Sequence, residues 1–237
     1  MTLQHCFHDL LVRAAAELYQ DHSDRMQQPD LIPTPNAIDD ADLVLFFEGL
    51  DCGLIRLERG GRFNTLDRPT LGGRWALLSR SRDGAWYNAE YLPQLATYVE
   101  LVRRLGYPPG RVLFELPQHS LQLDLAVLTD QDTVAMLGEA KRAAGMLDPL
   151  IEAVRHRFSE IQPGEETWRR GDEARQLAWR RWLTRVPYLW LIGPGIRRAH
   201  RCSYALLALD TVRSLPAAQD VRLSHRPAAQ MAPPALQ

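Results

Sequence analysis

The order of the elements predicted after residue 88 constrains the fold of this chain more than any other feature of its sequence. Three strands in close succession, then two helices and a further strand, indicate a mixed sheet with helices on its faces. The expected class is therefore α/β. The apolar spacing predicts a helix over residues 90–105, strands over 112–116, 121–128 and 133–141, helices over 146–158 and 165–185, and strands over 188–192 and 201–209.

The first 84 residues follow another pattern and are expected to form an α+β accessory region. Apolar residues at helical spacing predict a helix over residues 2–20, and the polar, proline-containing stretch 21–42 is expected to be a linker. The main domain would then cover residues 85–213, and the tail 214–237, rich in Ala, Pro and Gln, is expected to be disordered. Short accessory strands are predicted over residues 43–47, 53–57 and 74–79.

Composition excludes several classes of protein. A hydrophobic content of 46% and a charged content of 24% are ordinary for a globule and argue against a wholly disordered chain. The three cysteines form no Cys-x-x-Cys pair, which argues against a disulfide framework or a thiolate zinc site. We find neither the apolar pattern of a signal peptide nor a run long enough to span a membrane, so we expect a cytoplasmic protein without a membrane partner.

Two of the predicted strands carry charged residues at positions where these would meet. In residues 121–128 the odd positions are apolar, which turns Asp124 toward the opposite face of the sheet. In residues 133–141, Glu139 and Lys141 are two positions apart and share a face. If the two strands pair as a hairpin, the three side chains converge at one edge of the sheet. Two carboxylates and one ammonium suit a hard divalent cation beside a phosphate.

This arrangement resembles the PD-(D/E)XK nuclease superfamily, which has the restriction-endonuclease-like fold. Asp124, followed after fourteen residues by Glu139-Ala140-Lys141, is similar to the motif that names the family. The predicted helix that starts near Glu90 and the three strands after it follow the family's element order. The resemblance covers roughly residues 86–193. It implies a restriction-endonuclease-like mixed sheet flanked by helices.

The resemblance also implies a nuclease that hydrolyses the phosphodiester bonds of DNA with Mg²⁺ or Mn²⁺. In such a site Asp124, Glu139 and the main-chain carbonyl of Ala140 would bind the metal. Lys141 would position the attacking water, and Glu90 would complete the catalytic group directly or through water. Lys141 is the single lysine among 28 basic residues. A compact ammonium suits a place beside a metal-bound water better than the larger, planar guanidinium does.

Charge is distributed unevenly along the chain, although the net charge is only −1. Residues 168–201 hold nine arginines against two acids, whereas residues 1–60 hold eleven acids against four arginines. The basic segment suits phosphate contacts, and the acidic region would shield that surface or bind a protein partner, a second copy of the chain included. The residues expected to contact nucleic acid are Arg142, Arg169, Arg170, Arg180, Arg181, Arg197 and Arg198.

Each of these residues also has an ordinary structural interpretation. Glu139 and Lys141 could form a surface cross-strand ion pair, and Asp124 could be a solvated edge residue. The chain would then be a nucleic-acid-binding or structural protein that keeps the fold without cleaving. The combination of all three residues on facing strands favours the nuclease. A ribonuclease is a further alternative, since the metal chemistry is the same; DNA is the expected partner.

Overall fold

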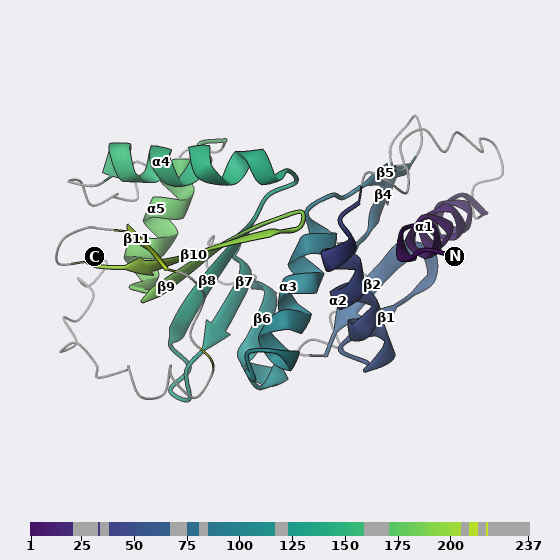
Figure 1. Ribbon diagram of the computed structural model, residues 1–237, viewed down its shortest axis with the longest axis horizontal. Coiled ribbons are helices and arrows are strands. Elements are labelled where there is room, and N and C mark those ends of the chain that lie inside the picture. The colour runs from purple at the N-terminus through teal and green to yellow at the C-terminus, as the bar shows by residue number, and fades with distance from the viewer. Residues whose placement is uncertain are drawn as a thin grey trace, which may run out of the picture.

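The computed structural model describes residues 1–20, 33, 38–66, 75–80, 85–116, 123–158, 171–204, 209–212 and 217. The chain has the predicted mixed α/β class, with helices on both faces of a six-stranded sheet and two smaller sheets near its N-terminal helices (Figure 1). The predicted tail over residues 214–237 lies outside the described residues except for Ala217. No described helix is both long and apolar enough to cross a membrane.

The six-stranded sheet is built by the second half of the chain. Strands β8 and β9 are parallel neighbours, and every other neighbouring pair is antiparallel. Two helices connect β8 to β9, as expected for parallel neighbours, which need a crossover rather than a hairpin. In their order across the sheet, the strands are β11 (Leu209–Val212), β10 (Ile196–Cys202), β9 (Tyr188–Gly193), β8 (Val134–Ala140), β7 (Leu123–Leu128) and β6 (Val112–Leu116).

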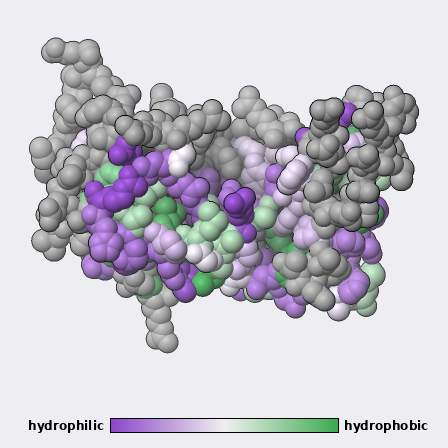
Figure 2. Space-filling model, turned by 90° about the horizontal axis from the view of Figure 1, so that it is seen from above, coloured by the Kyte–Doolittle hydropathy of each residue, from purple (hydrophilic) through white to green (hydrophobic). Residues whose placement is uncertain are grey.

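Helices cover the two faces of this sheet because its strands bury alternate side chains on opposite sides. Leu125 and Ile192 join the core beneath α3, whereas Leu137 and Leu191 join the core beneath α4 and α5. Figure 2, which views the molecule from the α4 side, shows hydrophilic residues interspersed with small apolar areas over that part of the surface. The three helices are α3 (Tyr91–Arg103), α4 (Leu147–Phe158) and α5 (Glu173–Thr184).

The accessory region packs into the same core as α3 and the sheet. Phe63 lies against Phe114 of β6, with ring centroids 5.5 Å apart in an edge-to-face arrangement. The expected boundary at residue 84 falls between β4 and β5, which pair with each other. The elements here are α1 (Leu3–Gln20), α2 (Asp40–Asp51), β1 (Ile55–Leu57), β2 (Arg62–Thr65), β3 (Trp75–Ala76), β4 (Leu78–Arg80) and β5 (Ala85–Tyr87). Short 3₁₀ turns are η3 (Arg59–Gly61), η4 (Pro109–Arg111) and η5 (Ala144–Met146).

Two predicted strands were wrong. Residues 43–47 lie in helix α2, which begins after Asp39, whose side chain accepts a hydrogen bond from the Ala41 amide. A short apolar run fits either a strand or a buried helix, and here this N-cap accompanies the helix. The strand predicted over residues 201–209 was also misplaced, because β10 ends at Cys202 and β11 begins at Leu209. The sequence did not predict the start of β10 at Ile196, because charged residues interrupt the apolar pattern of this strand.

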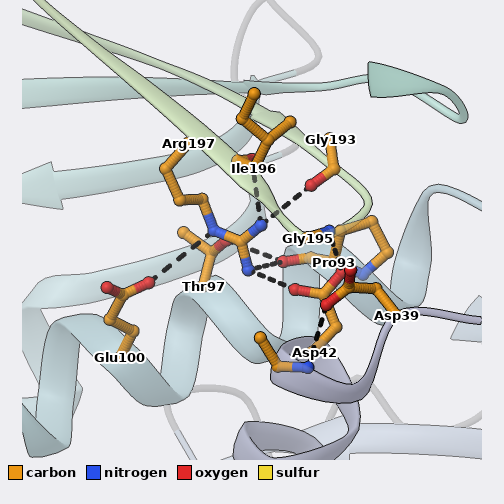
Figure 3. A network of polar contacts seen from close by, with 10 residues as sticks. Asp39, Asp42, Pro93, Thr97, Glu100, Gly193, Gly195, Ile196 and Arg197 are labelled. Atoms are coloured by element: carbon orange, nitrogen blue, oxygen red, sulfur yellow. Dashed lines mark hydrogen bonds and ion pairs between the residues drawn. The ribbon is translucent and has the colours of Figure 1, made fainter.

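An ion pair docks α2 onto the turn between β9 and β10 (Figure 3). Arg197 Nη2 donates to Asp42 Oδ1 over 2.7 Å, and the Gly195 amide donates to Asp42 Oδ2 over 2.8 Å. The same guanidinium donates to the main-chain oxygen of Pro93, in the first turn of α3. Asp42 is only 2% exposed. Asp42 therefore holds the accessory region against the end of the sheet where α3 begins.

Candidate active site

The backbone brings Asp124 of β7 opposite Glu139 of β8. The antiparallel register pairs Leu125 with Gly138, so the next pair toward the end of β8 is Asp124 with Glu139. The amide of Ala140 donates to Asp124 Oδ2 over 2.6 Å, and Gln94 Nε2 of α3 donates to the Asp124 carbonyl over 2.5 Å. The Asp124 carboxylate is thereby fixed against the strand that carries Glu139.

Lys141 lies directly after β8 and beside the Glu139 carboxylate. Its amide donates to the Ile192 carbonyl of β9, which extends the parallel pairing by one residue. Its Nζ lies 2.9 Å from Glu139 Oε1, and both side chains are 7% exposed. Burial alone would lower the pKa of Lys141, but the nearby carboxylates of Glu139, Glu173 and Asp124 outweigh it and raise the pKa. Lys141 is therefore an ammonium at neutral pH.

Helix α5 contributes two side chains that sequence reasoning did not place in the site. Arg180 Nη1 donates to Glu139 Oε2 over 2.6 Å, and Glu173 Oε2 lies 3.4 Å from Lys141 Nζ. Glu173 and Arg180 are seven residues apart and therefore lie on one face of the helix. That spacing was visible in the sequence, but nothing in it showed that this face meets the end of β8.

Glu90 reaches the same edge of the sheet from the N-cap position of α3. Partial burial raises the pKa of the Glu90 carboxyl, while Lys141 and a hydrogen bond from the Arg142 backbone act in the opposite direction. Glu139 and Glu173 are close enough to raise the same pKa further. The structure thus brings Asp124, Glu139, Lys141 and Glu90 into one electrostatic group.

The charges in this group do not balance. Four carboxylates, those of Glu90, Asp124, Glu139 and Glu173, face the two cations Lys141 and Arg180, which leaves a surplus of two negative charges. Hard carboxylate oxygens with surplus negative charge match the ligand preference of Mg²⁺ or Mn²⁺. Among the described residues no group of three or more His, Cys, Asp or Glu side chains is arranged so that it could hold a metal ion. Magnesium commonly binds one or two carboxylates and completes its shell with water and phosphate oxygens, so this donor set fits it.

The arginines expected to contact nucleic acid lie in different environments. Arg142 is exposed beside the site, and Arg198, 3.5 Å from Asp148, is partly exposed. Arg180 and Arg197 are engaged with Glu139 and Asp42 inside the molecule. Arg181 is buried, and Arg169 and Arg170 lie outside the described residues.

Comparison with protein-family models, curated proteins and solved structures found no match to this chain. The geometry and charge of the group around Glu139 are therefore the basis on which a function can be proposed.

Proposed function

We propose that this protein is a metal-dependent nuclease that hydrolyses phosphodiester bonds of DNA, built on a restriction-endonuclease-like fold. The observation that carries the proposal is the meeting of Asp124, Glu139 and Lys141 at the ends of β7 and β8. Two features make an ordinary surface ion pair a poor explanation. Counted as whole residues, Glu139 and Lys141 are 5% and 6% exposed. The group to which they belong also carries surplus negative charge.

The element order adds support for the fold. A helix, α3, is followed by the three antiparallel strands β6, β7 and β8, by two helices, and by β9 parallel to β8. The first four of these elements follow the helix–strand–strand–strand order of the family that the motif resembles. Asp124 and Glu139 occupy adjacent strands, with Ala140 between Glu139 and Lys141. The placement agrees with a shared site for the three motif residues.

In this proposal Asp124, Glu139 and the carbonyl of Ala140 hold the divalent cation. A bound Mg²⁺ supplies Lewis acidity toward the phosphate and lowers the pKa of a coordinated water. The raised pKa of Lys141 keeps its Nζ protonated, so Lys141 acts as a hydrogen-bond donor and stabilises developing negative charge. It does not act as the base.

Arg180 positions the Glu139 carboxylate in this proposal. Its contact with Glu139 Oε2 and the contact of Lys141 with Oε1 hold the carboxylate in one orientation. Preorganised carboxylates avoid the cost of rearrangement when a substrate arrives. The exposed Arg142, next to the site, contacts the phosphate backbone in this proposal.

The test is cleavage of plasmid DNA, single-stranded DNA and RNA with Mg²⁺, Mn²⁺ or EDTA. We expect cleavage of DNA with either metal, none in EDTA, and a loss of about a hundredfold or more in Asp124→Asn and in Lys141→Met. Asp40→Asn, an exposed acid of α2, is the matched control and should cleave like the wild type. Activity that survives both site substitutions contradicts the assignment. A folded wild type that binds DNA but cleaves none of the substrates favours a binding protein.

A further inference from the structure

Residues 174–209 contain seven arginines and not one acidic residue. Four of these arginines form ion pairs with acids elsewhere in the chain, at distances between 2.6 and 3.5 Å. For the other three, Arg181, Arg185 and Arg201, the described part of the chain provides no ion pair. The paired arginines are Arg175 with Asp172, Arg180 with Glu139, Arg197 with Asp42, and Arg198 with Asp148.

Arg181 is the unusual member of the three because it is buried. It is 4% exposed, and its Nε and Nη1 have no hydrogen-bond partner among the residues that the structure describes. A guanidinium stays charged in a protein, and a buried charge without a counter-ion is strongly unfavourable. Its neighbour Arg180 is equally buried, but the charge of Arg180 is balanced by an ion pair with Glu139. Arg181 therefore has a binding capacity that the described chain does not use.

A second arginine, Arg185, lies beside the same Tyr204 ring as Arg181. The guanidinium carbon of Arg181 lies 6.0 Å from the centroid of this ring, and that of Arg185 lies 5.2 Å from it. Arg185 also lies over Trp182, at 4.9 Å from the ring centroid. Two cations around one ring repel each other, so the arrangement gains from an anion between or beside them.

Hydrogen bonds hold Tyr204 against the end of α5. The Tyr204 hydroxyl lies 2.9 Å from the Arg181 carbonyl and 2.7 Å from the Val186 carbonyl, which ties it to the last turn of α5 and the residues after it. Arg185 caps α5 in the left-handed region, with a φ of 53°. The side chain of Arg185 is exposed, whereas Arg181 is buried, so Arg185 is the solvent-facing member of the pair.

We infer that Arg181 and Arg185 form a phosphate-binding site at the C-terminal end of α5, and that it takes a backbone phosphate of a nucleic-acid strand. Guanidinium groups are the preferred donors to phosphate because their N–H groups match its oxygens. The half-buried indole of Trp182 beside the arginines offers an aromatic surface of the kind on which bases stack. Phosphate would supply the anionic counter-charge that the described part of the chain does not give to Arg181.

The site lies next to the carboxylate group around Glu139 but on another side of α5. Arg180 contacts Glu139, whereas Arg181, one residue later and about 100° further around the helix, faces Tyr204. A strand bound at Arg181 and Arg185 would therefore pass beside the proposed cleavage site. The assignment of a nucleic-acid strand rests on the proposed function, but phosphate binding itself does not require cleavage.

Two measurements in EDTA test this inference without any cleavage. The first is fluorescence anisotropy of a labelled single-stranded oligodeoxythymidine over a series of salt concentrations. We expect Arg181→Met and Arg185→Asn each to weaken binding by about tenfold and to reduce the salt slope by about 0.7, the value of one phosphate contact. Asparagine is chosen at position 185 because it tolerates a positive φ. Arg56→Gln, an exposed arginine of β1, removes the same charge elsewhere and should keep the wild-type slope.

The second measurement is the melting temperature with and without inorganic phosphate. Phosphate should raise the melting temperature of the wild type and of Arg56→Gln, but not that of Arg181→Met or Arg185→Asn. Unchanged strand binding and salt slope in both site variants would overturn the inference. A phosphate shift that depends on Arg181 with strand binding that does not would show that the site takes a small phosphorylated compound. Because EDTA removes the cation needed for cleavage, these results stand apart from the nuclease test.

Discussion

Arg180 and Glu139 are 41 residues apart in the chain, yet Arg180 Nη1 donates to Glu139 Oε2 over 2.6 Å. Their side chains are 5% and 7% exposed. The pair joins the middle of α5 to the end of β8, and Lys141 holds the other carboxylate oxygen. Two cationic partners, one on each oxygen, fix the orientation of this buried carboxylate.

Removing Arg180 should destabilise the protein strongly. Arg180→Met leaves the buried Glu139 with Lys141 as its remaining partner, and breaking a buried pair from one side costs about 3 kcal/mol. The free energy of unfolding from urea titration measures this. The control is Arg103→Gln, whose pair with Glu48 is at the surface, with exposed fractions of 54% and 34%; its cost should stay below about 1 kcal/mol. If both variants lost the same small amount of unfolding free energy, the buried pair would not contribute more to stability than the surface pair.

The pair between Asp42 and Arg197 should couple the accessory region to the sheet. Asp42→Asn keeps the shape of the side chain but removes the charge that Arg197 faces, and we expect a loss of about 3 kcal/mol. A double-mutant cycle with Arg197→Met should give a coupling energy of about 1 kcal/mol or more in chemical denaturation. Asp40→Asn, in the same turn but exposed, should cost less than about 1 kcal/mol. Additive single losses would show that the two residues do not stabilise each other.

The Gly195 turn should tolerate no side chain. A Cβ at this position would lie 2.1 Å from Asp39 Oδ2, and the φ of 65° disfavours alanine. Gly195→Ala should therefore lower the free energy of unfolding by about 1–3 kcal/mol. Gly145→Ala is the control, since a Cβ there meets no atom within 4 Å and its φ is not positive. A thermal melt in which the two alanine variants behave alike would count against this close approach of α2.

His200 should make stability depend on pH in mildly acidic solution. Burial, with Arg155 and Arg198 nearby, lowers the pKa of His200 from 6.5 to about 4, although Asp148 and Glu152 act in the opposite direction. The unfolded chain therefore binds the proton more tightly, so the free energy of unfolding falls as the pH drops from 6.5 toward 4. The shift corresponds to a loss of up to about 3 kcal/mol.

The measurement is the difference in unfolding free energy between the wild type and His200→Gln across this pH range. The difference isolates His200 from Glu90 and Glu100, whose pKa values are raised by burial and whose contributions have the opposite sign. His156→Gln, which replaces a histidine whose side chain is 82% exposed, is the surface control. A His200→Gln profile parallel to that of the wild type would contradict the lowered pKa.

The sequence predicted local structure well where one side of an element is buried. The apolar odd positions of β7 and the helical spacing in α3 and α4 gave these elements nearly their true bounds, because burial of one face imposes a period on the chain. The prediction failed for α2, where the apolar run at residues 43–47 fits two periods equally well. It also failed for the start of β10, where arginines occupy strand positions and pair with acids on other elements.

The sequence by itself determined that Asp124 and Glu139 lie on two neighbouring strands, with Lys141 close behind Glu139, because the side-chain period of a strand is two and a hairpin needs few residues to close. Only the tertiary structure decided what surrounds them. Glu173 and Arg180 reach the site because α5 packs across β8, and Arg181, one residue later on the helix, faces Tyr204 and lacks a counter-ion among the described residues. A helix turns by 100° per residue, so adjacent arginines enter different surroundings that no local pattern distinguishes.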